Sequence, residues 1–235
     1  MRDHARVHLD CGRRQFLHTV LAGAAVGIAA HAGSELAAPP TLHAQTPLTP
    51  DAALHELLAG NERFVAQQLT SIARDLTILR EHTVEKQEPF AAVLACADSR
   101  VPVELVFDQT IGHLFVTRIA GNIATPEIIA SLEYGVAVLK ISALLVLGHT
   151  SCGAVKAAMQ AGPGAWPQIS ALYQHLRPAV AQSGGNVAQA IAINARLQAE
   201  LLRTSSPVIR DALKAGTVKV EAGVYDLATG KVSLS

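Results

Sequence analysis

Two uninterrupted apolar runs constrain this chain of 235 residues more than any other feature. Residues 90–95 and 143–148 contain no charged or hydrogen-bonding side chain. Runs this short indicate strands rather than buried helices, and apolar residues on both strand faces are typical of a parallel sheet covered on both sides. The first run leads into Cys96-Ala97-Asp98-Ser99-Arg100, and the second leads into His149-Thr150-Ser151-Cys152-Gly153.

Strand patterns alternate with helical patterns along the rest of the chain, which predicts an α/β fold. We expect a mostly parallel central β-sheet flanked by helices, with an N-terminal helical arm and an antiparallel edge strand. The expected elements are helices at 51–68, 75–86, 125–139, 151–160 and 186–203, strands at 90–96, 114–119, 143–148, 218–227 and 232–234, a loop at 162–167 and a turn at 229–230.

The N-terminal segment is typical of an export signal. Arg13-Arg14-Gln15-Phe16-Leu17 is a twin-arginine signature, and the apolar run at 19–30 is too short to span a bilayer. Small-residue cleavage candidates follow at Ala32 and Ala44. We therefore expect residues 1–44 to be a signal peptide with its linker and 45–235 to be a single domain, periplasmic or secreted. A tail with an accidental arginine pair and an uncleaved membrane anchor are the alternatives.

The balance of charge excludes two classes of partner. Lys and Arg total 19 and Asp and Glu total 19, whereas nucleic acids and anionic membranes attract an excess of basic residues. Aromatic residues make up only 4% of the chain, which also argues against a platform that stacks on bases. We expect a small-molecule substrate, no nucleic-acid partner and no stable membrane insertion of the mature chain.

The residues that follow the two apolar runs form a ligand set suited to zinc. Cys96, His149 and Cys152 offer two sulfurs and one imidazole, and Asp98 offers a carboxylate. Because the carboxyl ends of parallel strands meet at one edge of a sheet, these side chains are expected to converge there. A disulfide between Cys96 and Cys152 is the alternative, but it explains neither His149 nor Asp98.

Arg100 distinguishes a catalytic from a structural zinc site. Its guanidinium can hold the Asp98 carboxylate in a bidentate ion pair, which leaves the fourth zinc position open to water. Released from Arg100, Asp98 would reach the metal and close the site. We therefore expect Asp98 to be a conditional fourth ligand.

The motifs resemble those of β-class carbonic anhydrases over nearly all of the chain from Asp51 onward. The two zinc motifs of that family match 96–102 and 148–153. Further matching segments are Gly60-Asn61-Glu62-Arg63-Phe64, Phe107-Asp108-Gln109, Leu114-Phe115-Val116, Ala120-Gly121-Asn122 and Glu133-Tyr134-Gly135.

The resemblance implies a function and a set of site residues. The expected reaction is the reversible hydration of carbon dioxide to bicarbonate and a proton by zinc-bound hydroxide, with one Zn²⁺ per chain. The expected zinc ligands are Cys96, His149 and Cys152 with Asp98 as exchangeable fourth, the expected catalytic dyad is Asp98 and Arg100, and the expected substrate-binding residues are Gln87, Phe115, Tyr134 and Gly153.

The resemblance also implies a homodimer or a higher homo-oligomer. In such an assembly Tyr134 would be contributed across the interface, and the helix at 51–68 would wrap the partner. At Gly153, the missing side chain would let the backbone approach the pocket. Two other functions stay open: a zinc hydrolase of carbon disulfide or carbonyl sulfide on the same scaffold, and a zinc-binding envelope protein without enzymatic activity.

Overall fold

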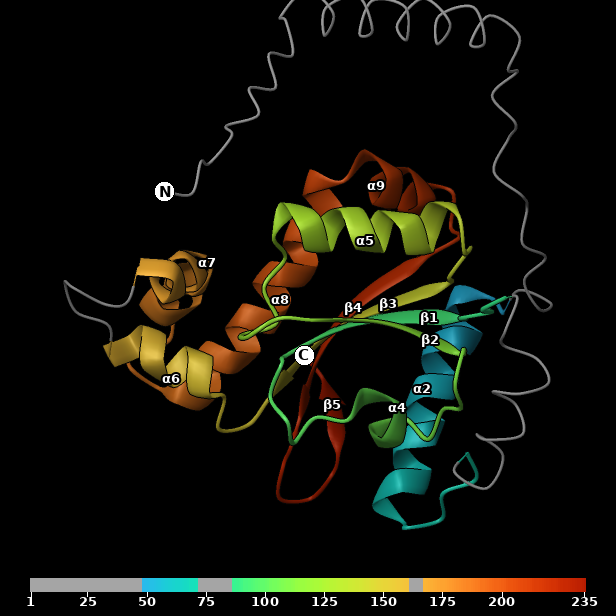
Figure 1. Ribbon diagram of the computed structural model, residues 1–235, viewed down its shortest axis with the longest axis horizontal. Coiled ribbons are helices and arrows are strands. Elements are labelled where there is room, and N and C mark those ends of the chain that lie inside the picture. Colours follow the sequence, from blue (N-terminus) through green and yellow to red (C-terminus); the bar gives the residue numbers. More distant parts are fainter. Residues whose placement is uncertain (1–47, 72–85, 161–166) are drawn as a thin grey trace, which may run out of the picture. The chain divides into compact units, whose positions relative to one another are not determined.

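A five-stranded sheet forms the centre of the fold, with its strands in the order β2-β1-β3-β4-β5 (Figure 1). In this computed structural model the described residues are 48–71, 86–160 and 167–235. Strands β1 to β4 pair in parallel, and β5 pairs antiparallel with β4, so the expected fold class is confirmed. The strands are β1 Ala91–Ala95, β2 Leu114–Arg118, β3 Ala143–His149, β4 Lys219–Tyr225 and β5 Val232–Leu234.

Most of the helices begin where the sequence supplies a cap or a proline. Thr49, Asn186 and Ser206 each accept a backbone N–H at the first turn of α2, α8 and α9. Among the described residues no helix has the length and apolar content needed to cross a bilayer. The helices are α2 Pro50–Val65, α4 Val103–Val106, α5 Pro126–Ala137, α6 Gly153–Gln160, α7 Pro167–Gln182, α8 Val187–Ser205 and α9 Pro207–Lys214.

Most expected elements are present within a few residues of their expected bounds, and three helices are additional. Helix α4 is too short to show a helical period, α7 contains Pro178, and α9 is an eight-residue helix directly after α8. The signal segment at 1–44, the helix at 75–86 except for its last residue, and the loop at 162–167 except for its last residue lie outside the described residues. Residue 167 begins helix α7.

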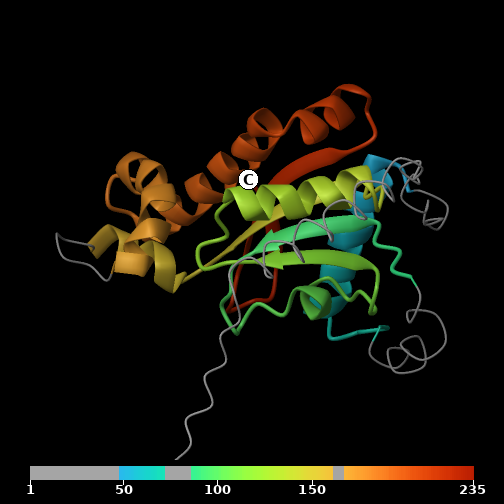
Figure 2. The ribbon, with the colours of Figure 1, turned by 45° about the horizontal axis from the view of Figure 1, so that its top comes forward.

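Each face of the sheet is buried under its own helices (Figure 2). Ala92 and Leu94 of β1 pack with α5, α8 and α9, whereas Ala91, Val93 and Ala95 pack with α2 and α4. All five side chains of β1 are fully buried. The alternation explains why the apolar run at 90–95 has no polar position, since both strand faces contribute to a core.

Helix α2 is built into the core of its own chain. Asn61 donates to the carbonyls of Val106 and Gly230 at 3.0 and 2.8 Å and accepts from Val232 N at 2.8 Å. A Cβ at Gly60 would lie 1.8 Å from the carbonyl oxygen of Phe107, so only glycine permits this approach. The helix expected to wrap a partner therefore has a role inside the monomer.

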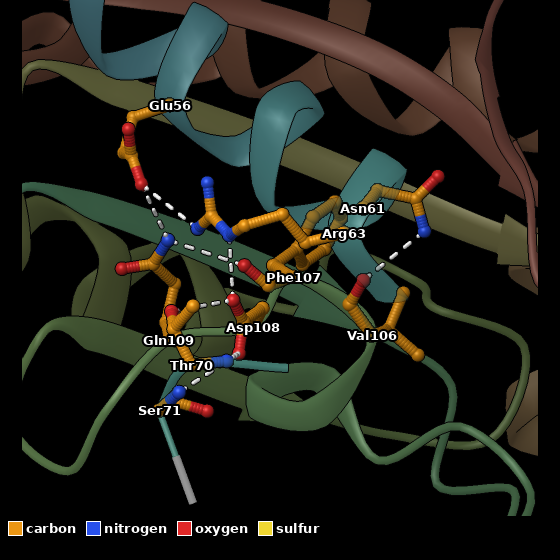
Figure 3. Close-up of polar contacts among 9 residues, drawn as sticks. All are labelled: Glu56, Asn61, Arg63, Thr70, Ser71, Val106, Phe107, Asp108 and Gln109. Carbon is orange, nitrogen blue, oxygen red and sulfur yellow. Dashed lines mark hydrogen bonds and ion pairs between the residues drawn. The ribbon is translucent and has the colours of Figure 1, made fainter. Parts of the chain in front are cut away.

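A buried carboxylate fastens the end of α2 to the loop after α4. Figure 3 shows Arg63, Thr70 and Ser71 converging on Asp108. Its carboxylate accepts from Arg63 Nε at 2.6 Å, from Thr70 N and Oγ1 at 2.9 Å and from Ser71 N at 3.0 Å. Burial raises the pKa of Asp108, but the bonds from Arg63, Ser71 and Thr70 together hold that pKa well below its usual range.

Asp108→Asn is expected to remove stability that depends on pH. A carboxylate with a depressed folded pKa stabilises the protein above its unfolded pKa of about 3.9, and this contribution is lost as pH falls through the folded pKa. The variant should therefore be about 2–3 kcal/mol less stable at pH 7, and the difference should shrink below about pH 4. Urea unfolding between pH 3 and 7 measures both effects.

Asp211→Asn is the matched control, since that side chain is 71% exposed. It should leave the unfolding free energy and its pH dependence nearly unchanged. If the unfolding free energies of the wild type and of Asp108→Asn fall in parallel as the pH is lowered, the pH-dependent stability does not come from the Asp108 carboxylate.

Candidate metal centre

The topology of the sheet brings two ligand-bearing strands together. From β1 the chain passes to β2, which pairs with β1 on one side. The next strand, β3, pairs with β1 on its other side and is followed there by β4 and β5. Ligands in open α/β sheets collect at such a switch point, at the carboxyl ends of the strands. Ala95 pairs in register with Leu147, Cys96 follows β1, and His149 is the last residue of β3. The two side chains therefore reach the same edge.

Cys152 joins them through a tight turn between β3 and α6. Ser151 adopts a left-handed conformation with φ of 58°, which reverses the chain within two residues of His149. The turn is tied to the end of β4, because Thr150 N donates to Tyr225 O at 2.9 Å and Leu227 N donates to Thr150 Oγ1 at 3.0 Å. The strain of the left-handed residue is thus held by neighbouring hydrogen bonds.

The three ligand atoms form a compact, buried cluster. The Cys96 and Cys152 sulfurs and an imidazole nitrogen of His149 all lie within 4.8 Å of one another. Tetrahedral zinc places such atoms about 3.8 Å apart, given Zn–S bonds of about 2.3 Å. The exposed fractions are 4%, 1% and 0% for Cys96, Cys152 and His149. Both cysteines are free thiols rather than a disulfide in this structure.

The imidazole of His149 is oriented to act as a ligand. Its Nδ1 lies 3.0 Å from the carbonyl oxygen of Thr150, which can only accept, so Nδ1 carries the proton. Within the described part of the chain, Nε2 is buried without a hydrogen-bond partner. An unpaired buried nitrogen beside two sulfurs fits a metal ion and is otherwise unfavourable. The donor set and its spacing therefore fit zinc.

The two thiols differ in their affinity for protons. A hydrogen bond from Cys152 lowers the pKa of Cys96 against the opposing effect of burial, and His149 and the Gly121 N–H add to the lowering. The same bond and burial raise the pKa of Cys152. Both sulfurs would bind a metal ion as thiolates, so a bound cation would displace the proton from Cys152.

Asp98 lies at the rim of the cluster and is held by Arg100. Its carboxylate accepts from Arg100 Nε at 2.9 Å, from Nη2 at 2.8 Å and from the backbone N at 3.0 Å. Its Oδ2 is 3.8 Å from His149 Nε2. The bonds from Arg100 outweigh burial and hold the pKa of Asp98 well below its usual range. The carboxylate is therefore ionised, adjacent to the three ligands, and engaged by arginine.

Two neighbours of the cluster, Arg118 and Gly121, were given no role by the sequence analysis, although Gly121 lies in a segment that matches the family. Arg118 Nε donates to the Cys96 carbonyl at 3.0 Å, and its Nη2 donates to the Asp98 carbonyl. Gly121 N donates to Cys96 Sγ at 3.3 Å. The available signal was the strand pattern at 114–119, since Arg118 ends β2 opposite Ala95. These contacts fix the backbone that carries Cys96 and Asp98.

Three of the expected substrate-binding residues lie away from their own chain's cluster. Phe115 pairs with Ala92, four residues before Cys96, which corresponds to about 13 Å along the strand. The Tyr134 ring lies 6.2 Å from the Phe115 ring, centroid to centroid. Gln87 is exposed in the segment that precedes β1. These three side chains therefore lie toward the amino ends of the strands, opposite to the metal ligands.

Gly153, the fourth of these residues, is adjacent to Cys152 at the start of α6. A Cβ added there would meet no atom within 4 Å. The expected steric reason for glycine is therefore not found among the described residues, and its role toward substrate stays a prediction.

Comparisons with known proteins decide the family. The carbonic anhydrase family profile matches residues 91–232. The chain belongs to the carbonic anhydrase family. It is 36% identical over 192 residues to a carbonic anhydrase of Mycolicibacterium smegmatis, a match that covers 79% of this chain and 93% of that protein. A carbonic anhydrase of Pseudomonas aeruginosa is 35% identical over 162 residues, covering 63% of this chain and 73% of that protein.

The solved structures place the chain in the β-class. The β-carbonic anhydrase of Coccomyxa, determined with acetazolamide, superimposes with a TM-score of 0.63 at 27% identity. This match covers 77% of the present β-carbonic anhydrase and 85% of the Coccomyxa chain. The resemblance inferred from the two zinc motifs is therefore confirmed at the level of the family and its class.

Proposed function

We propose that this β-carbonic anhydrase catalyses the reversible hydration of carbon dioxide to bicarbonate and a proton, with one zinc ion per chain. The observation that carries the proposal is the buried Cys96–His149–Cys152 cluster with an arginine-held carboxylate at its rim. A storage or structural zinc site has no need of Arg100, because Asp98 could then complete the ligand set. Family membership and site chemistry thus support the same activity.

The residues around the cluster have distinct tasks in this reaction. Cys96, His149 and Cys152 would hold the zinc ion, which would supply a Lewis acid that lowers the pKa of a bound water to about 7. Arg100 keeps Asp98 ionised and away from the fourth ligand position. The Asp98 carboxylate accepts a hydrogen bond from the water and directs its lone pair toward carbon dioxide. Because Asp98 cannot donate, it acts as an acceptor and not as a proton source.

Asp98→Asn is expected to retain about one zinc per chain and to lose most of its hydration activity. The amide keeps the shape of the side chain but removes its charge and its pair with Arg100. We expect kcat/KM to fall roughly 100-fold or more, within the range seen for acid–base groups. Zinc analysis and stopped-flow carbon dioxide hydration on the same samples measure both quantities.

Asp211→Asn again serves as the control and should keep both zinc and activity. Equal loss of zinc and activity in Asp98→Asn would make Asp98 a structural ligand. A wild type with zinc but without hydration activity would contradict the proposed reaction, and assays with carbon disulfide and carbonyl sulfide would then test the related hydrolase.

We also propose that the enzyme is a homodimer or higher homo-oligomer with composite sites. Phe115, Tyr134 and Gln87 lie toward the strand end opposite to the metal ligands of their own chain. Tyr134 is 44% exposed, and β2 has no strand on its outer side within the described residues. A two-fold interface could therefore bring these side chains to the partner's cluster.

A hybrid dimer tests the composite site. As a pure protein, His149→Ala should be inactive because it lacks a metal ligand. Tyr134→Ala should be roughly tenfold impaired, because loss of a pocket side chain costs about 1.4 kcal/mol of transition-state binding. Co-expressed with two different tags and purified as a hybrid, they should recover about half of wild-type activity, since one of two sites is then intact.

The control is a hybrid of His149→Ala with Asp98→Asn. Each of these substitutions disables the metal centre of its own chain, so both sites of the hybrid are defective and activity should not recover. If the Tyr134→Ala hybrid also fails to exceed the average of its parents, Tyr134 acts within its own chain. A monomeric wild type in light scattering would likewise exclude the composite site.

We propose that residues 1–44 direct export by the twin-arginine route to the periplasm or beyond. The support is the Arg13-Arg14-Gln15-Phe16-Leu17 signature before a short apolar run. Because this route carries folded proteins, zinc can be loaded before export.

Lys substitutions at both Arg13 and Arg14 should retain the enzyme in the cytoplasm, measured by cell fractionation. Substituting Arg2 and Arg6 in the same way is the control, and equal export of the two double variants would contradict the route.

A further inference from the structure

Two buried amide side chains on α8, Asn194 and Gln198, have no part in the reaction described so far. Asn194 is 1% exposed and Gln198 is 4% exposed, and the two residues are one helical turn apart. Burying a primary amide is unfavourable unless its donors and acceptors are paired. Their partners therefore indicate what these side chains stabilise.

Both amides bind the loop that follows β2. Asn194 Nδ2 donates to the Gly121 carbonyl at 2.8 Å, and Ala124 N donates to Gln198 Oε1 at 2.8 Å. Gln198 Nε2 donates to Asn194 Oδ1 at 3.2 Å, which links the two amides to each other. Helix α8 thus holds the loop 121–124 at both of its ends.

A backbone N–H of this loop reaches the metal centre. Gly121 N donates to Cys96 Sγ at 3.3 Å in a buried position. Gly121 has a φ of 81°, and a Cβ there would lie 3.1 Å from Leu176 Cδ2. The direction of this N–H therefore depends on a left-handed glycine, packed against α7 and held from behind by Asn194.

We propose that Asn194 and Gln198 are positioning residues of the metal centre, which aim the Gly121 N–H at the sulfur of Cys96. The proposal rests on the zinc function inferred above. An N–H donor withdraws charge from a metal-bound thiolate and fixes its direction. Without the two amides, the loop is free to turn this N–H away from Cys96. The sulfur then keeps more negative charge, and its direction toward the metal is less well fixed.

Asn194→Leu and Gln198→Met test the proposal in the full chain. Both replacements are close in size and remove the hydrogen bonds. Asn194→Leu should weaken zinc binding about 10–100-fold, the range for lost outer contacts of a metal ligand. It should also move the sulfur-to-cobalt charge-transfer band of the Co²⁺-substituted protein to longer wavelength. Gln198→Met should change the zinc affinity and the band position in the same direction but by a smaller amount, because the bond from Asn194 to Gly121 remains.

Asn186→Ala separates positioning from general stability. Asn186 caps the same helix through a 3.0 Å bond from Gln189 N, eight residues before Asn194. This control should lower the unfolding temperature but leave the zinc dissociation constant, measured by chelator competition, and the cobalt band at wild-type values. If it changes both as much as Asn194→Leu does, the amides act only through stability and the proposal is wrong.

Two further outcomes are decisive. If both amide variants keep wild-type zinc affinity and an unchanged cobalt band, the positioning role is wrong. If Asn194→Leu does not fold, the same two measurements on Gln198→Met decide the question. Failure of the underlying function is recognised separately, because the wild type itself would then bind no zinc or would not hydrate carbon dioxide.

Discussion

The parallel pairing of β1 with β3 is the constraint on which the metal centre depends. Ala95 lies opposite Leu147, and this register places Cys96 and His149 at the same edge of the sheet. Both strands are buried on both faces, with alternate side chains packed into different cores. A slip by one residue would exchange the two faces of a strand and lose that packing. The burial of apolar surface therefore also fixes the distance between two metal ligands.

The site is organised in successive layers around these strand ends. Backbone turns bring in Cys152, with left-handed Ser151 held against the end of β4. Arg100 then holds the Asp98 carboxylate at the rim, through an ion pair formed within three residues of chain. Arg118 and the Gly121 N–H support the Cys96 segment from β2 and its following loop. Each layer uses hydrogen bonds from an element whose position the sheet has already set.

The metal ligands and the expected substrate-binding side chains lie at opposite ends of the strands, so one chain does not suffice for the proposed pocket. The metal ligands lie at the carboxyl ends of the strands, whereas Phe115 and Tyr134 lie toward the amino ends. Side chains about 13 Å apart along a rigid strand cannot converge within one subunit. The proposed two-fold assembly would overcome this separation without any change in the fold. Helix α2 is fixed within its own chain by Asn61 and Asp108, and its expected contact with a partner stays a prediction.

The sequence by itself determined the local parts of this protein. Two apolar runs predicted the central strands, and the residues after them predicted the zinc ligands and the Asp98–Arg100 pair, because these features depend on neighbours in the chain. Only the tertiary structure decided which distant groups meet them. The amides of Asn194 and Gln198 lie more than seventy residues beyond the loop that they bind, and nothing in the amphipathic pattern of α8 indicates that partner. Hydrogen bonds over such separations follow from packing α8 on the sheet, which no local pattern encodes.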